Sequence, residues 1–125
     1  MLMQAISVRQ PWAWLLLHKG KNVENRSWAL PACYVGVPLL LHAGKTEAPV
    51  PPELRPLLTE YEGRLGGVVG RITFGPTTQG HPSRWAEPGA RHWPVLRSHP
   101  LPFFACCGQL GIFKVDYPFP LEALI

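Results

Sequence analysis

The sequence predicts an α+β domain, a small mixed β-barrel of five or six short strands with two helices. Three observations predict it. The chain has 125 residues, the usual length of one domain. Its 15 prolines and 12 glycines indicate many turns, and 46% hydrophobic residues are enough to fill a core. Short β-rich segments are spread along the chain between these turns, which is typical of a small barrel. We expect residues 1–125 to form a single domain.

The first half of the chain predicts both helices. Residues 4–8 have the composition of a short strand. Pro11 stands where a first helical turn accepts proline, and Gly20 stands where helices often end, so a helix is expected over residues 11–19. This helix is apolar on all sides, which predicts burial. Apolar residues at i, i+3, i+4 and i+7 predict the second helix over residues 51–62.

The other strands are expected at residues 23–28, 38–43, 67–74, 92–96 and 111–116. In the first of these, the two-residue period places Glu24, Arg26 and Trp28 on one face. The glycines at 67 and 70 predict a bulge or tight bend. The polar segment 75–91 is longer than most connections within a compact domain, so it is either functional or mobile.

The composition excludes several classes of protein. Charged residues make up only 16% of the chain, which excludes disorder driven by charge. The longest apolar run, residues 12–17, is far shorter than the roughly 20 residues of a membrane span. It also lacks the basic flank and cleavage site of a signal peptide. We therefore expect a soluble protein with no membrane partner.

The cysteines predict neither a disulfide framework nor a metal site. Cys33, Cys106 and Cys107 are odd in number, and two are adjacent, which disulfide geometry disfavours. No C-x-x-C or H-x-x-x-H spacing occurs. We expect a reducing, cytoplasmic setting and no metal or other cofactor. A classical hydrolase triad is also disfavoured, because no serine has the G-x-S-x-G context.

The net charge of +4 is compatible with a polyanionic partner. Arg9, Lys19, Lys21 and Arg26 form an early cluster of positive charge. The same balance also fits a protein that is merely kept soluble by its charge. Composition alone does not decide between nucleic acid and no polyanion at all.

The most informative stretch joins the end of the first strand, the start of the first helix and the next strand. If these elements pack together, the first helical N–H groups are free to meet an anion, while Lys21 and Arg26 supply positive charge. Glu24 can then orient the lysine, accept a proton or balance charge. The spacing also fits a solvated surface pair worth well under about 1 kcal/mol. The candidate site residues are Arg9, Gln10, Trp12, Lys21, Glu24, Asn25 and Arg26.

The five tryptophans are a high count for this length. Trp12 and Trp14 are expected in the core, on the buried helix. Trp28, Trp85 and Trp93 fit either burial or stacking on a base, which contributes about 1–3 kcal/mol when a base lies on an exposed ring. Tryptophan beside basic residues is typical of a reader of single-stranded nucleic acid.

His42 and Lys45 extend the candidate site at the end of the strand at residues 38–43. In one interpretation they line the same pocket as Lys21. In the other, His42 is a hydrogen-bonded structural residue, which is the more common role of a single histidine at a strand end.

Three sequence blocks resemble the ASCH family, whose name means activating signal cointegrator homology. Residues 6–13 read I-S-V-R-Q-P-W-A, residues 21–28 read K-N-V-E-N-R-S-W, and residues 41–45 read L-H-A-G-K. The resemblance continues at residues 67–70, 89–93 and 108–115, so it spans nearly the whole chain. It implies a PUA-like fold, a small β-barrel with helices related to the RNA-binding domains of pseudouridine synthases and archaeosine transglycosylases.

The resemblance also implies a function. In the ASCH family, a G-x-K-x-x-E-x-R pattern lines a cleft for nucleic acid or a nucleobase. Lys21, Glu24 and Arg26 match this pattern, while Lys19 replaces its glycine. The resemblance thus implies a nucleic-acid-binding domain that favours RNA or single strands. Lys21 and Arg26 are expected to meet phosphate, and Gln10 or Asn25 to read a base edge.

The main alternative is an enzyme acting on RNA or a modified nucleoside, with Lys21 and Glu24 as an acid–base pair. Distant family members include ribonucleases, and amidohydrolases that deacetylate N4-acetylcytidine with a lysine, a threonine three residues later and a remote glutamate. Glu24 stands at the threonine position here, and a carboxylate cannot directly replace that hydroxyl. A third class is a protein-interaction module that uses Trp85. The sequence leaves the oligomeric state open.

Overall fold

The computed structural model describes residues 1–120, which form one sheet with one α-helix and two 3₁₀ helices. This arrangement confirms the predicted α+β class and the small mixed barrel. The strands are β1 (Leu2–Gln10), β2 (Val23–Arg26), β3 (Leu39–Glu47), β4 (Gly67–Phe74), β5 (Arg91–Ala105) and β6 (Ile112–Asp116). The α-helix is α1 (Trp12–His18), and the 3₁₀ helices are η1 (Ala32–Tyr34) and η2 (Pro52–Leu58).

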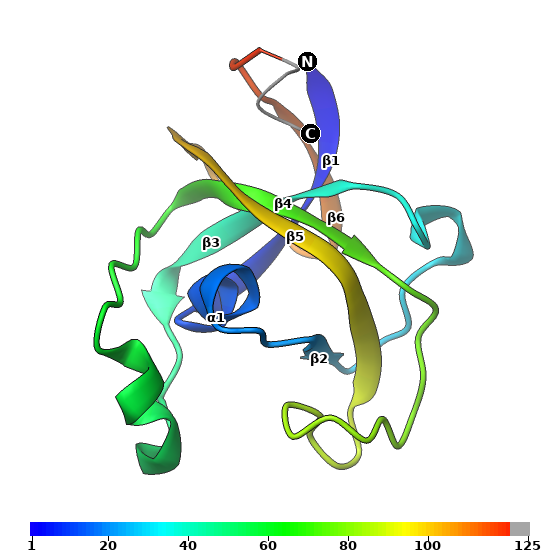
Figure 1. Ribbon diagram of the computed structural model, residues 1–125. Coiled ribbons are helices and arrows are strands. Elements are labelled where there is room, and N and C mark those ends of the chain that lie inside the picture. The colour runs from blue at the N-terminus through cyan, green and yellow to red at the C-terminus, as the bar shows by residue number, and fades with distance from the viewer. Residues whose placement is uncertain (121–125) are drawn as a thin grey trace.

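The six strands follow the order β2-β5-β4-β3-β1-β6. β1 and β3 are parallel, and the other neighbouring pairs are antiparallel. The sheet twists so strongly that β4 and β5 arch over α1 as a half-barrel (Figure 1). β2 lies beside the lower part of β5, on the same side of the arch as α1. The sheet therefore brings the ends of β1, α1 and β2 close together.

Two apolar clusters lie on opposite faces of the curled sheet. The larger one is enclosed between α1 and the sheet and includes Leu16, Phe74 and Trp93. The smaller one includes Leu40, Phe113 and Tyr117. Neighbouring leucines of β3 enter different clusters, because successive side chains of a strand point to opposite faces. The predicted burial of this strand on both sides is thus confirmed.

The second helix is present but is a 3₁₀ helix, shorter than the predicted residues 51–62. Pro52 begins it and Pro56 lies inside it. A proline inside an α-helix removes one hydrogen bond, and its ring clashes with the preceding turn. The apolar spacing was therefore a sound indicator of a helical segment but not of its type.

β5 is much longer than the predicted residues 92–96. It continues through Pro100 and Pro102 to Ala105 and pairs with β4 over most of this length. β2 covers only residues 91–94 of its other edge. Proline is tolerated where the missing N–H would face an edge without a neighbouring strand. The predicted bulge near Gly67 and Gly70 is confirmed by register shifts in β4.

Candidate nucleic-acid interface

A cleft of about 580 Å³ opens between the end of β1, the start of α1, β2, the start of η2 and the loop at residues 84–88. The turn after α1 brings the chain back to it, with Gly20 at φ +70° as predicted for a helix end. Most of the early candidate residues meet here. The lining residues are Ser7, Val8, Arg9, Trp12, Lys21, Glu24, Asn25, Arg26, Pro51, Glu53, Leu54, Arg84, Trp85, Ala86, Glu87 and Pro88.

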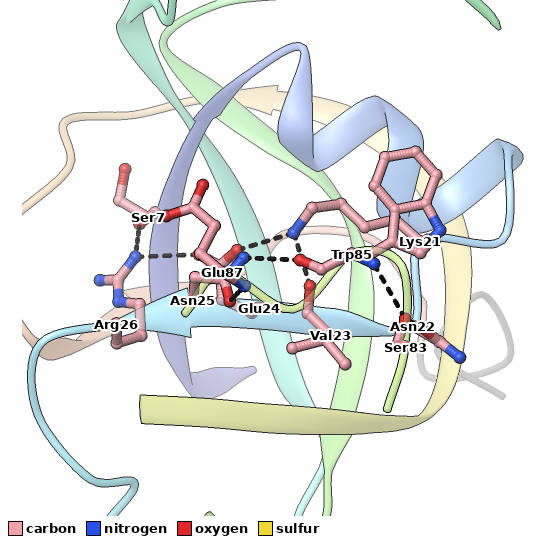
Figure 2. A network of polar contacts seen from close by, with 10 residues as sticks. All are labelled: Ser7, Lys21, Asn22, Val23, Glu24, Asn25, Arg26, Ser83, Trp85 and Glu87. Carbon is pink, nitrogen blue, oxygen red and sulfur yellow. Dashed lines mark hydrogen bonds and ion pairs between the residues drawn. The ribbon is translucent and has the colours of Figure 1, made fainter. Parts of the chain in front are cut away.

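Lys21, Glu24 and Arg26 form a connected ionic cluster in the cleft. Lys21 Nζ lies 3.3 Å from Glu24 Oε1, and Arg26 Nη1 lies 3.1 Å from Glu24 Oε2. Lys21 Nζ also donates to the Val23 carbonyl at 2.6 Å, and Arg26 Nη1 to the Ser7 carbonyl at 3.4 Å. Figure 2 shows Glu24 between the two cations, with Ser7 at the Arg26 end.

This ionic cluster differs from an ordinary surface ion pair because its side chains are largely buried. The side chains of Lys21 and Glu24 are 4% and 7% exposed, and that of Arg26 is 20% exposed. Exposed ion pairs contribute little, whereas removing one partner of a buried pair leaves an uncompensated charge at considerable cost. The alternative of a solvated surface pair is therefore wrong. Because two cations share one carboxylate, the ionic cluster carries one net positive charge.

Aromatic rings support both cations. Lys21 Nζ lies 5.7 Å from the centre of the Trp12 ring. The Arg26 guanidinium lies 5.6 Å from the Trp28 ring and 5.7 Å from the Trp93 ring. A cation over an aromatic face is attracted by the ring quadrupole. The contact of Arg26 with Trp28 agrees with the predicted two-residue period of this strand.

The tryptophans divide between the core and the cleft. Trp93 is fully buried, and Trp14 is 9% exposed. Trp12 is partly buried: it packs against the larger apolar cluster, so its predicted place in the core is confirmed in part, and it also lines the cleft with Trp85. Trp28 is partly buried and packs edge-on against Trp93, so it lies behind Arg26 rather than on the lining.

Asn25 lines the cleft and also has a structural role. Its Nδ2 donates to the Trp85 carbonyl at 2.9 Å, and its Oδ1 accepts the Glu87 N–H at 2.9 Å. Asn25 therefore attaches the loop at residues 81–88 to β2, as Figure 2 shows. Both ends of its amide are bonded to the chain, although the second N–H of Nδ2 is not used by these bonds, so the reading of a base edge by Asn25 stays a prediction.

Gln10 also serves the fold. Its Oε1 accepts the Trp14 N–H at 2.9 Å, and its Nε2 donates to the Arg64 carbonyl at 3.2 Å. It is buried and is not part of the cleft lining. Gln10 Oε1 already accepts one N–H of the first turn of α1, that of Trp14, so fewer donors remain for an anion at the helix start; the anion site itself stays a prediction.

His42 and Lys45 do not line the cleft. His42 is buried; its Nε2 donates to the Cys106 carbonyl at 2.8 Å, which leaves Nδ1 to accept the Ser7 hydroxyl at 2.9 Å. His42 is therefore a hydrogen-bonded structural residue, the second of its two predicted roles. Lys45 is exposed near the C-terminal end of β3.

The cleft also contains residues that the sequence did not single out as part of this site. Arg84, Trp85 and Glu87 come from the long polar segment, and Glu53 and Leu54 from η2. Four cations and three carboxylates line the cleft, so its charge is mixed. For Arg84, Trp85 and Glu87, the only indication in the sequence was a tryptophan within a polar loop. Only the folded chain brings this loop to β2.

No group of three or more histidine, cysteine, aspartate and glutamate side chains within residues 1–120 could hold a metal ion. None of the helices in that range has the length and apolar character to cross a bilayer. Cys33, Cys106 and Cys107 are all free thiols.

Comparison with protein-family models and with curated proteins finds no match for this chain. The resemblance to the ASCH family therefore stays a prediction carried by the three sequence blocks. The residues of the cleft itself indicate its chemistry. Those residues offer a fixed positive group, an adjacent carboxylate and two aromatic rings in one concave site.

Proposed function

We propose that this protein is an ASCH-like domain that binds nucleic acid in the cleft, with RNA or other single strands preferred over duplex DNA. The observation that carries the proposal is the buried ionic cluster of Lys21, Glu24 and Arg26 in a cleft that Trp12 and Trp85 also line. Positive groups attract phosphate, and exposed aromatic rings stack on unpaired bases.

Arg26 is the residue best placed to meet a phosphate or a base carbonyl. Its two bonds to Ser7 and Glu24 both use Nη1. Guanidinium has five N–H donors in a rigid fork, so further donors remain on Nη2 and Nε. The two rings beside its guanidinium hold the group in place. Lys21 is more deeply buried, and it fixes Glu24 and adds positive charge.

Binding of labelled single-stranded RNA and DNA at two salt concentrations tests the proposal. We expect micromolar affinity that weakens as salt rises, because phosphate contacts release counterions. Arg26→Ala and Lys21→Ala should weaken binding, and Lys114→Ala on the exposed face of β6 is the matched control. No binding of either strand at low salt would contradict the proposal.

An enzyme acting on RNA or a modified nucleoside is the second candidate. The observation that favours it is the 3.3 Å contact of Lys21 Nζ with Glu24 Oε1 in a cleft large enough for one base. A lysine and a carboxylate at this distance can exchange a proton. Incubation with a panel of RNAs and acylated nucleosides tests it. Turnover that Lys21→Ala abolishes supports chemistry, and identical product traces from the two proteins reject it.

The three free cysteines favour a reducing compartment such as the cytoplasm, and we include that location in the proposal.

A further inference from the structure

The loop at residues 81–88, here called the clamped loop, is fixed along its length by side chains of neighbouring strands. Asn25 of β2 bonds to the backbone of Trp85 and of Glu87. His92 of β5 is buried; its Nδ1 accepts the His81 N–H at 3.1 Å, and its Nε2 donates to the Glu87 carbonyl at 2.7 Å. These attachments restrict the backbone of the loop.

These bonds determine the position of one residue in particular. The N–H of Trp85 donates to Ser83 Oγ at 3.1 Å, and its carbonyl accepts from Asn25 at 2.9 Å. Ser83 Oγ in turn donates to Oδ1 of Asn22, the residue before β2 (Figure 2). Both backbone polar groups of Trp85 are thus held by partners, which fixes the point from which its side chain enters the cleft lining.

The surroundings of Trp85 suit a flat ligand. Trp85 is partly exposed, with the Arg84 guanidinium 4.9 Å from its ring centre. Trp12 lines the same cleft from the start of α1, and the ionic cluster lies in the same cleft. An aromatic side chain that is partly exposed to water is stabilised when another ring stacks on it. A nucleobase has such a ring, and its phosphate can reach the nearby cations.

We propose that Trp85 stacks on a single unpaired base of an RNA strand and determines the preference for unpaired over paired RNA, with Asn25 and His92 as positioning residues. This inference rests on the proposed function of the cleft. Bases within a duplex are stacked on one another and cannot offer a face to an indole, whereas bases of single strands, loops and ends can. The rigid loop lowers the ordering cost of binding because the ring is already in place.

The test compares binding of one single-stranded RNA and of the same RNA annealed to its complement. We expect Trp85→Ala to weaken single-strand binding by about ten-fold and Trp85→Phe to lose only a few-fold. Leu110→Ala, which removes a fully exposed apolar side chain elsewhere, is the control. The salt dependence of binding should stay the same in Trp85→Ala and become weaker in Arg26→Ala, because of these two side chains only that of Arg26 is charged and can meet phosphate.

Asn25→Ala gives a readout specific to positioning. We expect the Glu87 amide hydrogen to exchange faster and the affinity to fall, again with an unchanged salt dependence. In the unmodified protein, the indole N–H resonance of Trp85, assigned by its loss in Trp85→Phe, should shift when RNA is added. This measurement remains informative even if a variant folds poorly.

The possible failures are distinguishable. If the unmodified protein binds no RNA, the proposed function itself is contradicted. If it binds RNA and Arg26→Ala abolishes binding, but Trp85→Ala binds as tightly as the unmodified protein, only this inference is overturned. Equal affinity for the single strand and the duplex, or an unshifted Trp85 indole resonance, would also overturn it.

Discussion

Glu24 is the residue on which the candidate site depends most, because one carboxylate neutralises both Lys21 and Arg26. Replacement of a partner in a buried ion pair costs about 3–5 kcal/mol, since the remaining charge stays buried without compensation. We expect Glu24→Ala to lower the free energy of unfolding by an amount in this range. Glu87→Ala, an exposed carboxylate of the same cleft, should change it by less than about 0.5 kcal/mol.

Denaturant titration of the two variants measures this difference. An unchanged unfolding midpoint for Glu24→Ala would mean that the ionic cluster is solvated and would contradict its placement. If Lys21→Ala also destabilises the protein, the double variant with Glu24→Ala should cost less than the sum of the two single changes, because both remove the same contact.

Cys106 and Cys107 are adjacent but differ in their surroundings. Burial raises the pKa of the Cys106 thiol, an effect that outweighs its hydrogen bond with the Val68 backbone. Cys107 and Cys33 are exposed. The thiolate is the reactive form, so a raised pKa lowers the reactive fraction near neutral pH. We expect iodoacetamide to modify Cys33 and Cys107 first and Cys106 much later.

Mass spectrometry of digested, partly alkylated protein shows the order of modification. Equal rates for Cys106 and Cys107 would contradict the burial of the first thiol. Faster reaction of Cys106 at alkaline pH would agree with the account, because the thiolate fraction rises as the pH approaches the raised pKa.

The elements show which features the sequence alone could predict. Pro11, Gly20 and the apolar residues between them bounded α1 correctly, because capping and burial act locally. The length of β5 could not be predicted, since Pro100 and Pro102 lie where β2 leaves one edge of β5 without a neighbouring strand. Whether an edge is free depends on strand order, which local sequence does not encode.

The same reasoning separates the two parts of the candidate site. The contacts among Lys21, Glu24 and Arg26 arise from short spacing along the chain, within and just before β2, so the motif was visible in the sequence. The clamped loop meets β2 through contacts between residues about sixty positions apart in sequence, such as Asn25 with Trp85. Such pairings follow from the folded topology, and the sequence offered only a tryptophan in a polar loop.

The bulge in β4 gives a prediction for one element. A Cβ added at Gly67 would lie 2.5 Å from the Phe104 carbonyl oxygen and 2.6 Å from Phe103 Cζ. Backbone cannot move away cheaply, so Gly67→Ala should destabilise the protein by at least about 1–3 kcal/mol. Gly44→Ala in β3 is the matched control, because its Cβ would meet only Ser7 Oγ, at 3.5 Å. Thermal unfolding of both variants checks this, and equal midpoints would contradict the close approach of β4 and β5.

At the scale of the whole molecule, buried phenols limit stability at alkaline pH. Burial, together with the nearby Glu47 carboxylate, raises the pKa of Tyr61 from 10.0 to about 12. Burial also raises the pKa of Tyr117, whose hydroxyl donates to the Pro102 carbonyl at 2.8 Å. The unfolded chain ionises these groups near pH 10, before the folded protein does. Their contribution to stability is therefore complete below about pH 10 and is lost as the pH rises toward the folded-state values.

Denaturant unfolding at a series of alkaline pH values measures this loss. Tyr117→Phe should make the decline with pH less steep, although it also removes a hydrogen bond and so lowers stability at neutral pH. A decline just as steep in Tyr117→Phe would show that Tyr117 does not contribute to the alkaline loss.

The most direct test of the central claim is to map where RNA contacts the protein. Backbone amide resonances are recorded while a short single-stranded RNA is added to the isotope-labelled protein. The account predicts that the largest shifts fall on residues 21–26 and 84–88, with Arg9 and Trp12, and that β6 stays unchanged. Shifts confined to β6 or to the C-terminal end of β3 around Lys45, with no shifts at residues 21–26, would contradict it.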